Sequence, residues 1–299
     1  MLVLVVTGTL LPTAATEESP APRTSAGPAT QAQMTAAAAR ATAALKARDA
    51  AAWQAALPAV GAARRSVDSL FRHLVRLPWT EVRVIAEPVE GLPGRFYVGA
   101  VGELGGADPP DRIMARRVYD AVVRDGRLAL RDDVTPRDIR GQQMMAFEQP
   151  VAVQRNGLVV IADKAEQAAA EELARAGGPA RDRLELLGLS SRKPVVVYYY
   201  ASRRQLLRSL GEDPGEARIR FFSRVHVHLD HTRTWTRDIG VLGPALAGRE
   251  SWMPRMLAHE LTHAYTSDWF SGTRHAPTLL AEGLATAVEG GRSFQPLRD

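Results

Sequence analysis

The sequence predicts an α+β protein with two domains, and three observations support this fold class. The chain has 299 residues, of which 45% are hydrophobic, and this is enough apolar material for two cores of ordinary size. Apolar residues recur at helical spacing over 36–75, whereas residues 81–134 follow the two-residue period of β-strands. Beyond them, strand-like and helical segments alternate. We therefore expect an α+β accessory domain over 32–148 and a second domain over 149–299.

Residues 1–31 are expected to be an export signal and linker. Leu2 to Leu11 form an apolar run, which a stretch rich in Pro, Ser, Thr and Ala follows. The run is shorter than the roughly 20 residues needed to span a bilayer. No Lys or Arg precedes it, so a buried strand is the alternative. We expect a secreted or cell-envelope-associated protein without a stable membrane span in the mature chain.

The first domain is expected to consist of helices followed by antiparallel strands. Pro58 and Gly61 interrupt the helical pattern, which predicts two helices joined by a kink. Among the strand-like runs that follow, the last two flank Asp125-Gly126 and read as a hairpin. This order of elements resembles the cone-shaped nuclear transport factor 2-like folds. The resemblance implies an accessory role for residues 32–148.

The second domain is expected to alternate strands with helices. A strand over 157–162 precedes a long helix over 165–187, with a break at Gly177-Gly178-Pro179. The β-rich run 195–200 and a short helix come next. Residues 224–230 alternate with period two, which places two histidines on the face opposite the apolar side chains. We interpret this last segment as an edge strand.

Composition limits the chemistry that the chain can perform. The sequence has no cysteine, so a transition-metal site must be built from the seven histidines and from carboxylates. Lys and Arg outnumber Asp and Glu by 38 to 33, and the Arg residues are scattered rather than massed on one helix or tail. We therefore do not expect nucleic acid as a partner.

The segment His259-Glu260-Leu261-Thr262-His263 has the spacing of a zinc-hydrolase pentad. Residues four apart lie on the same face of a helix, so both imidazoles can reach one metal ion, with Glu260 beside them. Apolar residues recur at helical spacing around the pentad, and no Gly or Pro interrupts 255–269. The sequence therefore predicts a metal-binding helix.

A third ligand is expected from Glu282, because a catalytic zinc usually takes three protein ligands and leaves the fourth position to water. Glu282 follows the pentad by nineteen residues, which lets a second helix cross the first with its carboxylate toward the histidines. His226, His228 and His231 are candidates for a second metal cluster, although alternate histidines on an exposed strand face are more often just solvated.

The pentad together with Pro-x-x-Leu-x-Glu-Gly-Leu-Ala, within residues 259–285, resembles the gluzincin, or peptidase MA-like, family of zinc metallopeptidases. The resemblance implies a zincin-like metallopeptidase fold that binds Zn²⁺ through His259, His263 and Glu282. It also implies a zinc metalloendopeptidase that hydrolyses peptide bonds with zinc-activated water and with Glu260 as general base. A peptide or protein substrate would pair with the edge strand.

Two positions depart from the family pattern. Leu279 stands where many members carry Trp, and Thr286 stands where relatives often have a carboxylate that orients a histidine ligand. Tyr265, His231 and His275 are candidates for stabilising the oxyanion of the reaction.

Two other functions remain open at the level of sequence. The first is a catalytically weak or inactive peptidase-fold protein that acts as a binding or scaffold protein with a structural zinc. The second is a zinc hydrolase with a substrate other than a peptide. The presence of Glu260 argues against the scaffold, because a structural zinc does not need a base beside it.

Overall fold

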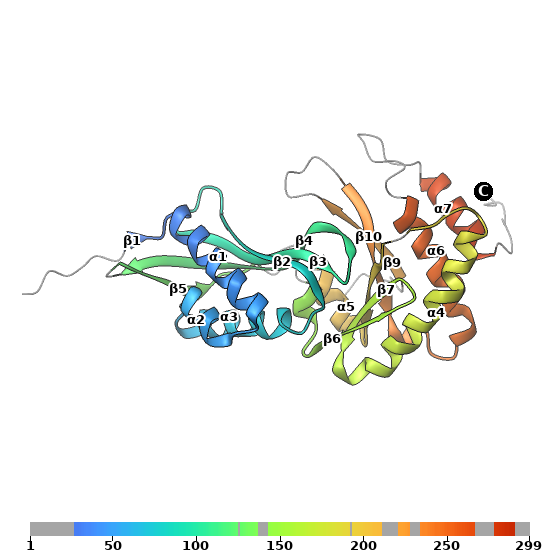
Figure 1. Cartoon of the computed structure of the whole chain (residues 1–299), viewed down its shortest axis with the longest axis horizontal. Helices are drawn as coiled ribbons and strands as arrows, with labels where there is room; N and C mark the ends of the chain where they lie inside the picture. Colours follow the sequence, from blue (N-terminus) through green and yellow to red (C-terminus); the bar gives the residue numbers. More distant parts are fainter. Residues whose placement is uncertain are drawn as a thin grey trace, which may run out of the picture.

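The computed structural model describes residues 27–124, 126–136, 143–191, 193–210, 221–227, 234–266 and 278–290. These residues form an α+β structure, as the sequence predicts, with one antiparallel and one mixed sheet (Figure 1). The elements are β1 (Gly27–Pro28), α1 (Gln31–Ala47), α2 (Ala50–Ala56), α3 (Gly61–Leu74), β2 (Trp79–Pro88), β3 (Arg95–Leu104), β4 (Ala107–Arg124), β5 (Arg127–Asp133), β6 (Pro150–Arg155), β7 (Leu158–Asp163), α4 (Gln167–Glu185), β8 (Val195–Tyr200), α5 (Arg203–Leu210), β9 (Phe221–Val227), β10 (Thr234–Leu242), α6 (Met253–Thr266) and α7 (Thr278–Glu289). None of the helices in the described ranges is long and apolar enough to cross a bilayer.

The first sheet is an antiparallel meander of β2, β3, β4 and β5. The short strand β1 pairs with β4 beyond the end of β3, with Gly27 opposite Val123. Arg124 pairs with Arg127, which confirms the predicted hairpin, although Asp125 lies outside the described residues. The long strand β4 therefore connects the whole sheet.

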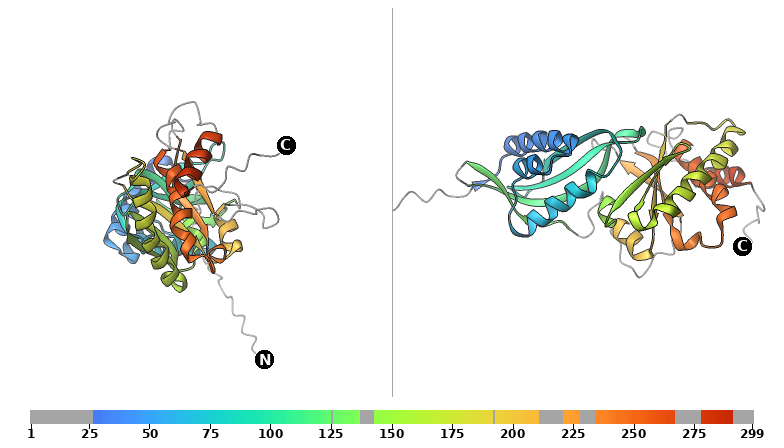
Figure 2. Two further views of the ribbon diagram at one scale, coloured as in Figure 1. Left: turned by 90° about the vertical axis from the view of Figure 1, so that its right-hand side faces the viewer. Right: turned by 60° about the horizontal axis from the view of Figure 1, so that its bottom comes forward.

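Three helices pack against this sheet, so the prediction of two helices is wrong (Figure 2). The additional break lies at Arg48, whose backbone is left-handed with φ 56°, and at Asp49. The Asp49 side chain accepts a hydrogen bond from the first turn of α2, which begins a new helix. A capping box of Thr30 and Gln33 begins α1. Residues 27–31 are thus part of the folded structure rather than of a free linker.

The second sheet has the strand order β6-β7-β8-β10-β9. The pairs β7–β8 and β8–β10 are parallel, whereas the outer strands β6 and β9 pair antiparallel with their neighbours. The predicted edge strand is confirmed for residues 224–227, which belong to β9; residues 228–230 lie outside the described residues. A turn of Asn156 and Gly157, with φ of 51° and 71°, joins β6 to β7.

Helix α4 continues through Pro179, although the sequence predicts a break at this point. Proline lacks a backbone N–H, so the carbonyl of Arg175 has no helical partner there. The side-chain amide of Asn156 donates to this carbonyl at 3.1 Å and to that of Ala174 at 3.2 Å. A tertiary hydrogen bond therefore replaces the helical one and stabilises the unbroken helix.

The two faces of the second sheet belong to two different hydrophobic cores. One face contributes to the core under α4 and α6, on the side away from the first sheet (Figure 1). The other face joins the core of the first sheet through Phe147, whose ring stacks on Tyr200 at 5.5 Å and on Tyr198 at 6.2 Å between centroids. The side chains of the second sheet in this shared core are Val159, Ile161, Val196, Tyr198 and Tyr200. The two sheets are thus joined by a continuous apolar core.

His73 of α3 adds a polar link across the same junction. Its side chain is buried, and Nε2 lies 2.6 Å from the carbonyl oxygen of Phe147, to which it donates.

We expect His73→Leu to lower the free energy of unfolding by about 1–3 kcal/mol, because the buried carbonyl of Phe147 loses its donor. Urea unfolding measures this change. His73→Gln keeps a donor and should lose less, whereas a His73→Leu protein as stable as wild type would contradict the link.

Candidate metal centre

The predicted pentad helix is present as α6, and the structure explains why it is stable. The side chains of Met256, Leu257 and Leu261 are buried in the core beneath the second sheet and α4. The hydroxyls of Thr262 and Thr266 donate to carbonyl oxygens one turn earlier, each at 2.8 Å. The buried face of α6 therefore holds the helix in place, and the histidine pair lies on a different part of its surface.

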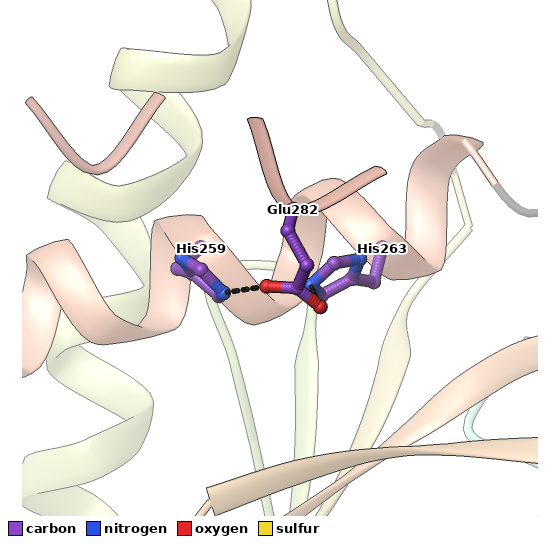
Figure 3. Close-up of side chains that lie close together, drawn as sticks. All are labelled: His259, His263 and Glu282. Atoms are coloured by element: carbon purple, nitrogen blue, oxygen red, sulfur yellow. Dashed lines mark ion pairs between the residues drawn. The ribbon is translucent and has the colours of Figure 1, made fainter. Parts of the chain in front are cut away.

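The three predicted ligands lie together (Figure 3). Nε2 of His259 is 3.4 Å from one carboxylate oxygen of Glu282, and Nε2 of His263 is 3.5 Å from the other. The two imidazole rings have centroids 5.1 Å apart and are inclined by 73°. The carboxylate of α7 therefore faces both histidines of α6, as the sequence predicts.

The spacing of these atoms is compatible with a shared metal ion. With metal–ligand bonds of about 2.0–2.1 Å, two ligand atoms of a tetrahedron are separated by roughly 3.3–3.4 Å. The nitrogen–oxygen distances of 3.4 and 3.5 Å are close to this value, but they join the histidines to two different oxygens of Glu282. One ligand atom from each of the three residues lies within 4.8 Å of the others, which leaves room for a shared metal ion. Two imidazoles and a carboxylate suit Zn²⁺, and imidazole also suits Fe, Ni and Cu ions.

The electrostatics at His263 favour the form of imidazole that binds metals. Burial lowers the pKa of His263, and the neighbouring His259 acts in the same direction. The charges of Glu282 and Glu260 oppose this effect without reversing it. Only a neutral imidazole nitrogen has a lone pair for a metal ion, so a lowered pKa keeps the ligand available near neutral pH.

One side of the cluster is open to solvent. The side chain of Glu282 is 54% exposed, whereas those of His259 and His263 are 20% and 15% exposed. Glu260 follows His259 on α6, and its side chain is 8% exposed. It lies near enough to His263 for its charge to act on the pKa of that histidine, in the raising direction. Structural zinc sites are usually closed by a fourth protein ligand, whereas catalytic sites keep an open position. In the described part of the chain the cluster has three candidate ligands, of which Glu282 is the most exposed.

A carboxylate that the sequence analysis missed also contacts the site. Oε2 of Glu289, in the last turn of α7, is 3.3 Å from Nδ1 of His259. The expected position for such a carboxylate is occupied by Thr286. Glu289 follows Glu282 by seven residues, which is two helical turns and therefore the same face of α7. This spacing is the signal that could have identified it.

Among the other candidate residues, only Tyr265 has a described side chain, and it does not join the cluster. Tyr265 packs beside the core toward α4, where burial raises the pKa of its hydroxyl and the charges of Arg181 and Glu185 act on it. Residues two apart do not share a helix face, so Tyr265 is directed away from His263. His231 and His275 lie outside the described residues, as do His228 and the side chain of His226.

Comparisons of the chain with models of protein families, with curated proteins and with solved structures give no match. The features of the described residues that bear on function are the pentad on α6 and the convergence of α6 and α7.

Proposed function

We propose that this chain is a zinc-dependent metallopeptidase of the gluzincin kind that hydrolyses peptide bonds. The observation that carries the proposal is the convergence of His259, His263 and Glu282, with Glu260 between the two histidines on the same helix. The open side of the cluster supports catalysis over a closed structural site, because a substrate can reach it.

In this proposal each residue has a separate task. His259, His263 and Glu282 would hold the ion, which would supply a lowered pKa for a water molecule and polarisation of the scissile carbonyl. Glu260 takes a proton from the attacking water and delivers it to the leaving amine. Strand β9 is at an edge of its sheet, so an extended substrate can pair with its main chain.

The same proposal includes a role for each of the two halves of the chain and for its amino terminus. The helices and the antiparallel meander of residues 32–148 are the evidence in favour of a nuclear transport factor 2-like accessory domain. The second sheet with α6 and α7 supports a zincin-like domain over 149–299. The apolar run at the amino terminus supports a secreted or cell-envelope-associated protein.

Elemental analysis of the purified protein tests the proposal first. We expect one zinc per chain in the wild type and its loss in Glu282→Ala, together with cleavage of unfolded casein that a chelator abolishes. Zinc without cleavage of casein or of a peptide library would support the scaffold with a structural zinc. A wild-type protein without zinc would contradict the metal site itself.

Zinc should also stabilise the folded protein, because only the folded chain brings its three ligands together. At a free zinc concentration about a thousandfold above Kd, the expected gain is about 4 kcal/mol. Thermal unfolding of metal-free protein, with and without zinc, measures it as an increase in Tm. His263→Ala removes one ligand and serves as the control. The same increase in the variant would show that zinc acts elsewhere.

A further inference from the structure

We infer that Glu289 is a positioning residue for His259, and this inference rests on the proposed zinc site. Its carboxylate lies on the Nδ1 side of the ring, 3.3 Å away, while Glu282 lies on the Nε2 side at 3.4 Å. The imidazole is thus placed between two carboxylates of one helix, and only the first is a metal ligand in the proposal.

Nδ1 of His259 requires a partner. The atom is buried, and none of the described residues forms a hydrogen bond with it. The 3.3 Å contact with Glu289 is within ion-pair range, although the present angle is not that of a hydrogen bond. A buried N–H is costly when it has no acceptor, and a small torsional change in Glu289, which is 30% exposed, supplies one.

The chemistry of the ring gives this contact a function. When Nε2 binds a metal ion, Nδ1 carries the proton and can donate it in a hydrogen bond to a carboxylate. Such a hydrogen bond fixes the tautomer and the orientation of the ring and makes the ligand nitrogen more basic. Glu289, one turn beyond Thr286, is placed to provide this interaction after the torsional change.

A residue of α4 holds the end of α7 that carries Glu289. The Arg183 guanidinium donates to the main-chain carbonyl of Glu289 at 3.4 Å, and a Cβ added to Gly290 would lie 2.9 Å from the same guanidinium. A cation at this position satisfies a carbonyl that the helix leaves without an internal partner. Helix α4 therefore fixes the last turn of α7 and, with it, the distance from Glu289 to His259.

Zinc affinity of the full chain, measured by competition with a chromogenic chelator, tests the role of Glu289. We expect Glu289→Gln to weaken zinc binding about tenfold and Glu289→Ala about tenfold to hundredfold, the range for such partners of metal ligands. Thr286→Ala changes the same helix without removing a carboxylate and should bind zinc like the wild type. Tm of the metal-free proteins should stay the same in Glu289→Gln, which separates a positioning effect from unfolding of α7.

A second readout concerns the ring itself. In the zinc-loaded wild type, the Nδ1 proton of His259 should give a slowly exchanging NMR signal, which Glu289→Ala should lose while the corresponding signal of His263 is retained. Wild-type zinc affinity in Glu289→Ala, in a preparation where Glu282→Ala loses zinc, would overturn the role of Glu289 alone. Absence of zinc from the wild type would overturn the proposed function and this inference together.

Discussion

Replacement of Glu260 by glutamine is expected to lower kcat for peptide hydrolysis by about 10²–10⁴-fold while one zinc per chain stays bound. The amide has nearly the same shape as the carboxylate, but it cannot accept the proton of the attacking water. His259 and His263 lie on either side of Glu260 on α6, and their contacts with Glu282 do not involve it. The ligand set should therefore survive the substitution.

Zinc content and casein cleavage, measured on the same preparation, separate the two functions of α6. Glu250→Gln is a matched control, because Glu250 lies in the turn before α6 and is exposed. It should retain both zinc and activity, whereas His263→Ala should lose both. Full activity in Glu260→Gln would remove the general base from the mechanism, whatever the zinc content.

The metal ligands could be predicted because each is defined by local spacing. Helical period alone places His259 and His263 on one face, and the apolar residues around them indicate which face of α6 is buried. Glu282 was found from its distance along the chain and the motif around it. Glu289 was missed because a lone carboxylate two turns further has no local pattern, and only the packing of α7 on α6 identifies it.

The errors in the fold also have physical causes. Strand β4 begins at Ala107, although Pro109 and Pro110 disfavour a strand by local sequence. The two prolines lie where the β3–β4 register is irregular, between the pairs Leu104–Ala107 and Gly102–Arg112. The sequence analysis does not predict strand β6, although Asn156-Gly157 is a hairpin signal between β6 and β7. The sequence predicts a helix break at Pro179 because local sequence does not show what replaces the lost helical hydrogen bond. The carbonyl of Arg175 accepts instead from Asn156, a residue nineteen positions before Arg175.

The core shared by the two sheets bears on the role of the first half of the chain. Phe147, Tyr198 and Tyr200 belong to the same cluster as residues of α1, α2 and α3. The face of β8 opposite this cluster belongs to the core beneath α6. The first half therefore supports the sheet on which the pentad helix packs, which is a structural role independent of any binding function.

A fragment of residues 149–299 is consequently expected to fail to fold stably. It would expose one face of the second sheet, where Val159, Ile161 and Val196 are buried in the full chain, together with Tyr198 and Tyr200. Burial of each aliphatic side chain contributes roughly 1.5–3 kcal/mol, and the large aromatic side chains at least as much. The sum, roughly 8–15 kcal/mol, equals the whole stability of a typical domain.

Circular dichroism and urea unfolding of the fragment beside the full chain measure this effect. Phe147→Ala in the full chain is the milder form of the same perturbation and should cost about 3–5 kcal/mol, because it removes the ring that stacks on both tyrosines. A fragment that unfolds cooperatively at the urea concentration of the full chain would show that the second domain is independent. The first half would then have to be explained by recognition or targeting, since the pentad helix would not need its support.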